Sequence, residues 1–176
     1  VDGTALDFAD DGTAPDATAG DGVYTAPFEV TDDSSVDSVN ISATAEVADK
    51  LPASASLSVP VIHTPANDNF AESAGLTGHK VSLSGFTNRG ATAEANEPRH
   101  YWSKPEASVW FTWRAPRSGR ADIWLKGSNF DTVLAVYRGS TLDRLRRVAR
   151  DDDGGGKLTS RCRFNVRRGR VYHFAV

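Results

Sequence analysis

Apolar residues occur along this chain in short runs, which Gly, Asp, Asn or Pro interrupts about every 8 to 12 residues. No segment keeps the i, i+3, i+4 spacing of an amphipathic helix over three turns. The pattern therefore predicts an all-β protein of antiparallel strands. The expected strands span residues 5–8, 23–30, 38–47, 54–62, 80–83, 108–113, 120–125, 132–137, 147–149, 161–166 and 171–176, and residues 70–74 are the one expected helical turn.

The alternation of apolar and polar residues is strictest in residues 38–47 and 161–167, and each segment predicts a strand with one buried face. In the second segment, the apolar face carries Cys162, Phe164 and Val166, and the polar face carries Arg161, Arg163 and Arg167. We therefore expect Cys162 to be a small core residue and the three arginines to form an exposed arginine stripe. A reactive thiol is disfavoured because no His and base accompany it.

A polar, Pro-containing stretch divides the chain into two parts. It spans residues 63–69 and follows a strand-like segment, so we expect a linker there. The part before it, residues 1–62, offers about four strands, whereas a complete immunoglobulin-like sandwich has roughly seven. We therefore predict two consecutive antiparallel β-sandwich modules: a partial immunoglobulin-like one in residues 1–62 and a second one in residues 70–176.

Charge is distributed unevenly between the two halves of the sequence. The 176 residues have a net charge of -3, but residues 1–88 hold 14 acidic residues against two lysines, a net charge of -12. Residues 89–176 hold 18 basic residues against nine acidic ones, a net charge of +9. This asymmetry predicts either an anionic partner for the second half or attraction between the halves, within one chain or between copies.

Composition disfavours several broad classes of protein. Cys162 is the only cysteine, which excludes a disulfide scaffold within the chain and zinc sites of the CxxC type. No run approaches the roughly 18 apolar residues of a membrane span, so none is expected. No basic segment followed by an apolar one opens the sequence, and we expect a mature piece without a signal peptide.

An acidic, glycine-rich loop occupies residues 10–24. It reads DDGTAPDATAGDGVY and resembles a turn found in immunoglobulin-like modules of bacterial secreted and surface proteins. The carboxylates of Asp10, Asp11, Asp16 and Asp21 would repel one another unless a hard cation or backbone N–H groups receive them. We therefore expect either a Ca²⁺ site or a set of Asx-turns in this loop, although the spacing does not fit an EF-hand.

Five motifs in residues 67–176 occur in the order found in one bacterial family. They are NDNFA at 67–71, GATAEANEPRH at 90–100, SVWFTWRAP at 108–116, GSNFDTVLAVY at 127–137 and DDD at 151–153. On these motifs the segment resembles the bacterial pre-peptidase C-terminal (PPC-type) β-sandwich domain. The resemblance implies a compact, jelly-roll-like sandwich that secreted peptidases and other exported proteins carry, often with Ca²⁺ and without catalysis of its own.

The resemblance also implies one more strand after residues 171–176, where this sequence ends. We therefore expect an open sheet edge beside residues 171–176. Either further sequence or a strand donated by another copy of the chain would complete the sheet.

A second group of acidic residues falls in turns of the second module that can share one end of a sandwich. These residues are Asp131, Asp151, Asp152 and Asp153. The family resemblance places three further acidic residues near the same edge: Asp68, Glu94 and Glu97. Convergent carboxylates would bind Ca²⁺, whereas isolated ones would cap turns.

Motifs for catalysis are missing from the sequence. It contains no GxSxG or HExxH segment and no glycine-rich phosphate loop that opens a helix, so we do not expect an enzyme. A stacking platform could come from five aromatic residues: Tyr101, Trp102, Trp110, Trp113 and Trp124. Alternation predicts that Trp113 is buried and that Trp110 and Trp124 are the exposed ones.

We expect a non-catalytic pair of modules from a bacterial secreted or cell-surface protein. Ca²⁺ would rigidify it, and it would work in adhesion, spacing or assembly with other protein domains or copies of itself. One alternative is a module that binds an anionic polysaccharide or another polymer through the arginine stripe, Trp110 and Trp124. A second alternative is an accessory domain of a secreted peptidase whose catalytic part lies outside this sequence. The acidic half and the expected extracellular setting disfavour nucleic-acid binding.

Overall fold

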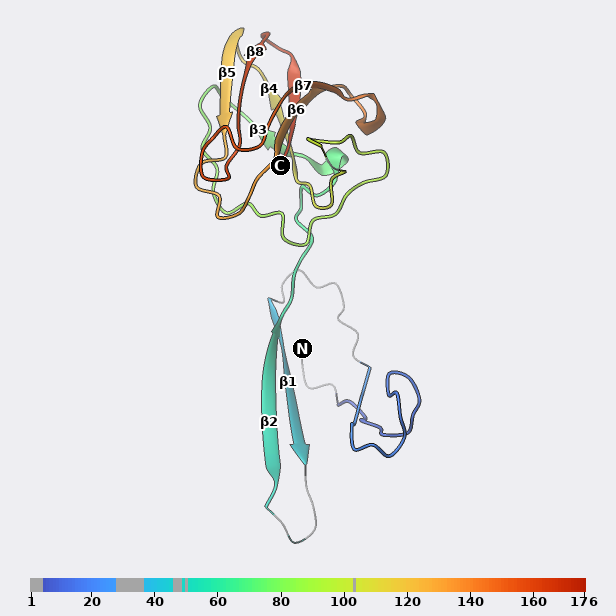
Figure 1. Ribbon diagram of the computed structural model, residues 1–176. Coiled ribbons are helices and arrows are strands. Elements are labelled where there is room, and N and C mark those ends of the chain that lie inside the picture. Colours follow the sequence, from blue (N-terminus) through green and yellow to red (C-terminus); the bar gives the residue numbers. More distant parts are fainter. Residues whose placement is uncertain (1–4, 28–36, 46–48, 50, 103) are drawn as a thin grey trace. The chain divides into compact units, whose positions relative to one another are not determined.

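The computed structural model describes residues 5–27, 37–45, 49, 51–102 and 104–176. The chain divides into two compact units, Val1–Ile62 and His63–Val176 (Figure 1). Residues 63–69, which the sequence assigns to a linker, belong to the second unit. Two of them, Asn67 and Asp68, are buried, and the Asn67 backbone C=O accepts the Trp110 N–H at 2.8 Å. The packed part of the second unit therefore begins before the expected linker ends.

The first unit contains a β-hairpin. β1 (Ser38–Ala45) pairs antiparallel with β2 (Ala53–Pro60), in two of the segments where alternation predicts strands. The register places Val39 opposite Val59, so apolar side chains of both strands share one face. This face is unevenly covered, because Val39 is buried and Val59 is exposed.

The other two strands expected in the first unit, residues 5–8 and 23–30, do not form a regular ladder in their described parts, and one isolated bridge joins this region of the chain. Ala9 and Thr25 form an isolated antiparallel bridge, and their N–H and C=O groups exchange bonds of 2.9 and 3.0 Å. The last part of the predicted strand 23–30 lies outside the described residues. Within the described part of this unit, the regular structure is thus one two-stranded sheet and one bridge.

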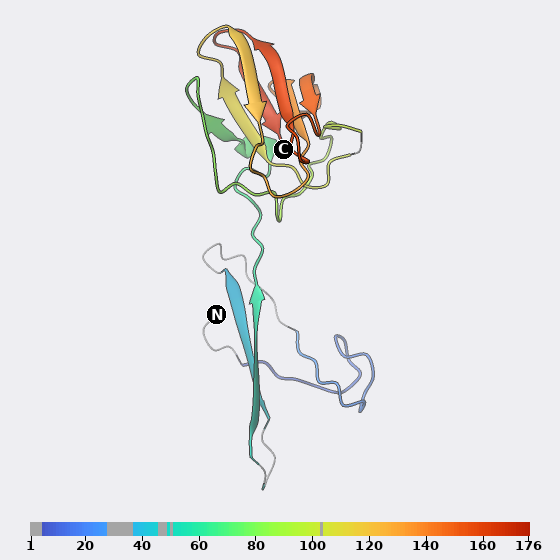
Figure 2. The same cartoon turned by 60° about the vertical axis from the view of Figure 1, so that its left-hand side comes forward.

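The second unit contains two sheets (Figure 2). Its strands are β3 (Ala74–Leu76), β4 (Trp110–Arg114), β5 (Gly119–Trp124), β6 (Leu134–Arg138), β7 (Arg146–Asp151), β8 (Arg161–Val166) and β9 (Val171–Ala175). The larger sheet has the order β3-β4-β9-β6-β7, and the smaller one pairs β5 with β8. Neighbours are antiparallel except β3 and β4, which run parallel. Two short 3-10 helices, η1 (Phe70–Glu72) and η2 (Leu142–Arg144), lie between strands, and η1 falls in the expected helical turn.

The two sheets of this unit pack against each other around a single apolar core. Phe111 of β4, Val136 of β6, Phe164 of β8 and Phe174 of β9 belong to one buried cluster, and Ile123 of β5 packs against it. Both sheets therefore bury one face in the same interior, which is the arrangement of a β-sandwich. The prediction of an all-β sandwich fold is confirmed.

Strand β8 shows the alternation that the sequence predicts. Cys162, Phe164 and Val166 are buried, whereas Arg163 and Arg167 are exposed. Burial raises the pKa of the Cys162 thiol to about 12. Its thiolate form is therefore scarce at neutral pH, as a core cysteine requires.

The predicted open edge beside residues 171–176 is wrong. β9 lies in the interior of the larger sheet, where Phe174 pairs with Phe111 of β4 on one side and with Val136 of β6 on the other. Residues 80–83, another predicted strand, have no strand partner and run as irregular chain. Among the described residues, the edge strands of this unit are instead β3 and β7 in the larger sheet and β5 and β8 in the smaller one.

The prediction that Trp110 is exposed is also wrong, because its side chain is 0% exposed. The second face of the larger sheet is covered as well, and Trp110 packs there with Tyr137 and with Leu142 of η2. The ring of Phe70, in η1, meets the Trp110 ring edge-on at a centroid distance of 5.2 Å. Central strands that are covered on both faces do not show which face is outward by alternation alone.

Candidate functional site

Three carboxylates of the second unit converge at one end of the larger sheet. Asp131 precedes β6, and Asp152 and Asp153 follow β7. Because β6 and β7 are antiparallel neighbours, with Leu134 paired with Asp151, the start of one strand and the end of the other lie side by side. One carboxylate oxygen from each of the three residues lies within 4.8 Å of the others. We call Asp131, Asp152 and Asp153 the strand-end cluster.

The strand-end cluster is electrostatically unfavourable without a cation. Partial removal from water raises the pKa of Asp152, and the charges of Asp153, Asp131 and Asp151 raise it further. Among the residues that the structure describes, no donor bonds to a side-chain oxygen of Asp131, Asp152 or Asp153. These oxygens are the hard ligands that Ca²⁺ prefers.

Asp151, the fourth predicted ligand here, has a different role. Its Oδ2 accepts the backbone N–H of Gly154 at 2.8 Å and that of Arg161 at 2.7 Å. A Cβ atom on Gly154 would collide with this carboxylate, so the turn fits closely around it. Asp151 thus fixes the turn that carries Asp152 and Asp153 and joins it to β8.

A second group of carboxylates lies in the first unit. One side-chain oxygen from each of Asp10, Asp16 and Asp21 lies within 4.8 Å of the others, and we call these residues the loop cluster. Asp10 accepts three backbone N–H groups, from Gly20 at 2.6 Å, Asp21 at 3.2 Å and Gly22 at 2.9 Å. Gly20 and Gly22 have φ angles of 73° and 86°, which glycine adopts without strain and which help to aim successive N–H groups at one anion.

The other acidic side chains of this loop also bind its own backbone. Asp16 accepts the N–H of Gly12 at 2.6 Å, and this bond lowers the pKa of Asp16. Asp11, which lies outside the cluster, makes an Asx-turn to the N–H of Thr13 at 2.8 Å. The loop thus contains the expected Asx-turns, and Asp10, Asp16 and Asp21 also lie close enough together to share a cation.

Asp68, Glu94 and Glu97 do not join the strand-end cluster, contrary to the expectation from the family resemblance. The two oxygens of Asp68 accept the N–H and hydroxyl of Thr92 at 2.6 and 2.7 Å. Glu94 accepts the Phe70 N–H at 2.6 Å, and Glu97 accepts the Glu94 N–H at 2.9 Å. These carboxylates connect the start of the second unit to residues 92–97 and thereby serve the fold.

A buried polar network surrounds His100. The His100 Nε2 lies 2.8 Å from Glu97 Oε1 and 3.1 Å from Ser108 Oγ, and its Nδ1 lies 2.9 Å from the Tyr137 hydroxyl. Burial raises the pKa of Tyr137 to about 12. A Ser-His-acid triad needs the serine and the acid on opposite ring nitrogens, whereas here both face Nε2. His100 and Ser108 are also buried, so this network is arranged to hold Glu97, His100 and Ser108 against Tyr137 of β6.

Two residues of the arginine stripe share one carboxylate. Arg161 donates to both oxygens of Asp122 at 2.8 and 2.6 Å, and Arg163 donates to Oδ2 at 3.1 Å. These bonds, that of Arg161 above all, lower the pKa of Asp122 to about 2. The third residue, Arg167, is exposed and belongs to the turn after β8. The stripe is therefore partly neutralised by its neighbour across the β5–β8 pair.

Trp124 is 42% exposed, in line with the prediction from alternation. The guanidinium carbon of Arg161 lies 4.6 Å from the Trp124 ring and the Lys126 ammonium lies 5.0 Å from it. Trp102 is the more exposed tryptophan at 71%, and Arg150 stacks on it at 4.5 Å. These two exposed tryptophans thus each carry a cation, and the sequence identified the less exposed one.

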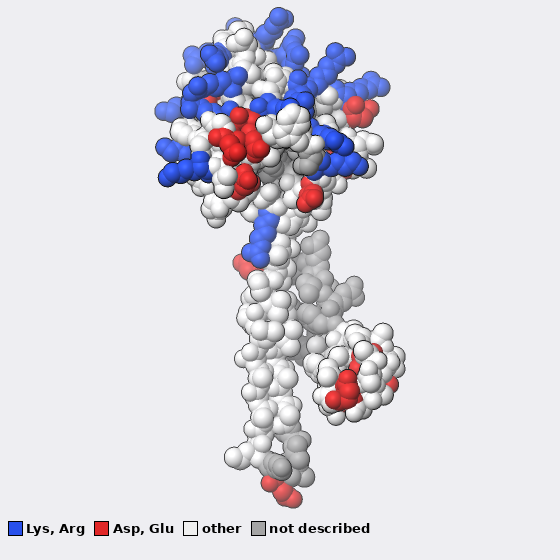
Figure 3. Space-filling model, viewed as in Figure 1, with Lys and Arg blue, Asp and Glu red and all other residues white. Residues whose placement is uncertain are grey.

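Basic side chains dominate the surface around these sites. Figure 3 shows Lys and Arg spread over much of the visible face of the second unit.

Among the described residues, no helix is long and apolar enough to cross a membrane. Comparison of the chain with protein-family models, with curated protein sequences and with solved structures gave no match.

Proposed function

We propose that this chain is a non-catalytic structural module of an exported bacterial protein and that Ca²⁺ stabilises it by binding to the strand-end cluster. The observation that carries the proposal is the convergence of three carboxylates for which the described residues provide no donor. Asp152 already has a raised pKa there, so a divalent cation would relieve a repulsion that the fold itself creates. The ion would join the end of β7 to the turn before β6.

The resemblance to the PPC-type domain supports the same proposal. Its motifs include the segments that hold Asp131 and Asp151 to Asp153. The β-sandwich of the second unit is compatible with that family, and we propose that the unit is a PPC-type domain of a secreted or cell-surface protein. We propose a role in adhesion or assembly, because the unit offers broad charged surfaces and its buried His100 network lacks the geometry of a nucleophilic triad.

Thermal unfolding with and without calcium tests this proposal. Chelation by EDTA should lower the melting temperature of the chain, and addition of calcium to about 10 mM should restore it. An extracellular site with a dissociation constant of about 10⁻⁴ to 10⁻³ M would then stabilise the native state by about 1 to 3 kcal/mol. Magnesium at the same concentration is the control, because it demands a stricter octahedral geometry. A melting temperature that does not respond to calcium would contradict the proposal.

A second candidate function is binding of an anionic polysaccharide at Trp124. The cations of Lys126 and Arg161 lie beside this half-exposed ring, a combination that suits a sugar ring with a carboxylate or sulfate group. Titration with oligogalacturonate should show binding that weakens with salt and that Trp124→Ala reduces at least ten-fold. Trp102→Ala is the matched control at the other exposed tryptophan. Equal affinities of the two variants would exclude the site.

A further inference from the structure

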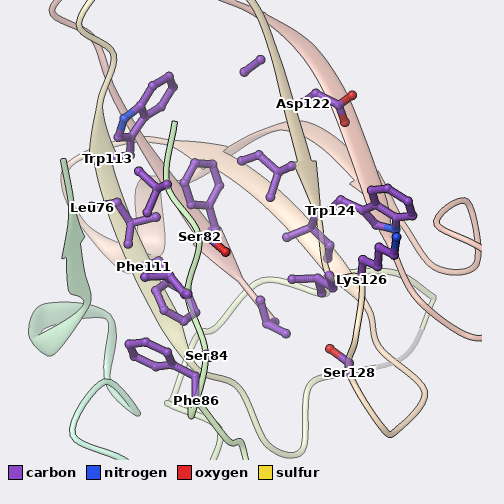
Figure 4. Close-up of a pocket in the computed structure, with 18 of the residues that line it drawn as sticks. Leu76, Ser82, Ser84, Phe86, Phe111, Trp113, Asp122, Trp124, Lys126 and Ser128 are labelled. Atoms are coloured by element: carbon purple, nitrogen blue, oxygen red, sulfur yellow. The ribbon is translucent and has the colours of Figure 1, made fainter. Parts of the chain in front are cut away.

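A groove lined by both apolar and polar residues lies between the open side of β5 and the irregular segment of residues 79–87 (Figure 4). Its volume is about 1020 Å³. Phe111 and Trp113 of β4 line it, Ala121 and Ile123 of β5 form one wall, and Val81, Leu83 and Phe86 belong to the other. The groove thus lies over the sandwich core, beside the smaller sheet.

Both walls of the groove have backbone groups available for pairing. Among the strands that the structure describes, β5 pairs with β8 alone, so its other edge has no strand neighbour there. Within the described residues, the backbone N–H and C=O groups of residues 79–87 make no hydrogen bond. An unpaired strand edge is a template for the addition of a further strand, because its main-chain groups can bond to any extended chain.

The apolar side chains on the groove wall are more exposed than a closed sandwich would leave them. Val81, Leu83 and Phe86 are 43, 47 and 49% exposed, and they lie within six residues of one another. Phe86 already contacts Phe111 of the core at a ring-centroid distance of 5.0 Å. A contiguous exposed apolar surface of this kind marks an interaction site more often than a single exposed residue does.

The charges around the groove indicate the chemistry of its occupant. Arg117, Arg120 and Lys126 line the groove, and its one acidic residue, Asp122, is bound by Arg161 and Arg163. The rim is therefore basic, and it favours an occupant with acidic residues at its ends. A second copy of this groove would face the first with charge of the same sign, which disfavours pairing of two β5 edges.

We propose that the groove binds an extended peptide segment of a partner protein, which adds to the smaller sheet beside β5. Apolar side chains at every second position of the segment enter the groove, and acidic residues near its ends meet the basic rim. The inference does not depend on calcium at the strand-end cluster, because the groove is lined by other residues.

A synthetic peptide, EDVTVTLTVDE, is a suitable probe for the full chain. We expect saturable binding in a titration followed by amide chemical shifts, with slower hydrogen exchange at residues 119–124 and intermolecular contacts between the backbone of the peptide and that of β5. The peptide EDTVVLVTTDE has the same composition without alternation and should bind at least ten-fold more weakly, because its apolar side chains cannot all face the groove. A third peptide, KKVTVTLTVKK, tests the charge of the rim.

Two pairs of variants locate the binding site. Leu83→Asp should weaken the acidic peptide about ten-fold, whereas Leu158→Asp, at an exposed leucine outside the groove, should not. Arg120→Glu should weaken the acidic peptide about three-fold and improve the lysine-flanked one, and Arg144→Glu is its control away from the groove. All four positions are exposed, so the variants should fold.

Three outcomes of the peptide experiments would overturn the proposal. They are no binding of the alternating peptide, equal affinity for both sequence orders, and binding that leaves the amides of β5 unprotected. A concentration-dependent dimer that protects β5 without any peptide would assign the groove to a second copy and would also overturn it. The calcium response of the melting temperature is measured separately, so failure of either idea leaves the other testable.

Discussion

The loop cluster and the strand-end cluster each bring three aspartates close together in space, yet their surroundings differ. In each, carboxylate oxygens from three aspartates lie within 4.8 Å of one another. The carboxylates of Asp10 and Asp16 in the loop cluster accept backbone N–H groups at 2.6 to 3.3 Å. The strand-end cluster receives no such bond from the described residues, and the pKa of its Asp152 is raised.

We infer from this difference that backbone donors, and not acidic residues alone, determine how strongly a cluster would bind a cation. A loop with glycine at positive φ can direct several backbone N–H groups at one carboxylate, and these dipoles stabilise its negative charge as a bound cation would. At the strand-end cluster, the N–H groups of Gly154 and Arg161 bond to the neighbouring Asp151, and within the described residues no donor is left for Asp131, Asp152 or Asp153. We therefore expect calcium to distinguish the two clusters.

The largest expected effect separates the clusters by their calcium response. Asp152→Asn should abolish the calcium-dependent stabilisation of about 1 to 3 kcal/mol, because it removes a charged ligand. Asp16→Asn should leave that stabilisation intact. Thermal unfolding of both variants, with calcium and with EDTA, measures the difference. A calcium response that Asp16→Asn removes would reverse the assignment.

The next effect is local to the loop cluster. Asp10→Ala should destabilise the loop by about 1 to 2 kcal/mol, because three backbone N–H groups lose their acceptor. This loss should be the same with calcium and with EDTA. Hydrogen exchange at Gly20, Asp21 and Gly22 measures it, and Asp7→Ala, at an exposed aspartate nearby, is the control. Exchange rates that change only in the presence of calcium would show that a cation holds this loop.

Asp122 is a third case, in which the carboxylate forms ion pairs with cationic side chains. Asp122→Asn should lower the free energy of unfolding by about 0.5 kcal/mol, since the pairs with Arg161 and Arg163 are partly exposed to solvent. High salt should remove most of this difference, as it does for surface ion pairs. Chemical denaturation at low and high salt measures it. Asp143→Asn, whose nearest cation is 3.7 Å away and exposed, should have no measurable effect.

The smallest expected effect concerns how stability depends on pH in the absence of calcium: Asp152 and Asp16 should contribute slopes of opposite sign. The pKa of Asp152 is raised above 3.8 in the folded state, so the folded protein binds this proton more tightly than the unfolded chain does. The free energy of unfolding should therefore increase as the pH falls from above the raised pKa towards 3.8. The folded state lowers the pKa of Asp16 below 3.8, so its contribution is present above 3.8 and is lost as the pH falls below it. Asp152→Asn and Asp16→Asn should each remove one of these slopes. Slopes of the same sign would contradict the contrast.

Local alternation was sufficient to predict much of the fold. Residues 161–167 alternate in sequence, and β8 buries Cys162, Phe164 and Val166 as expected because only one of its faces meets the core. The same reasoning failed at Trp110, because β4 is covered on both faces and alternation then carries no direction. The open edge expected beside residues 171–176 came from the family resemblance and is wrong, since the place of a strand within a sheet depends on long-range pairing that no local pattern contains.

The candidate sites were predictable only in part. Turn composition identified Asp131, Asp152 and Asp153, and the pairing of β6 with β7 brings them together. Sequence alone did not separate them from Asp68, Glu94 and Glu97, whose carboxylates are used by nearby backbone groups. The groove beside β5 had no sequence signal, because it arises from a strand edge that lacks a neighbour.

Isothermal titration of the calcium-free chain with calcium tests the central claim most directly. We predict one ion per chain bound at the strand-end cluster, loss of the binding heat in Asp152→Asn and an unchanged isotherm in Asp16→Asn. Absence of binding to the unaltered chain, or binding that Asp16→Asn removes and Asp152→Asn leaves intact, would contradict the account.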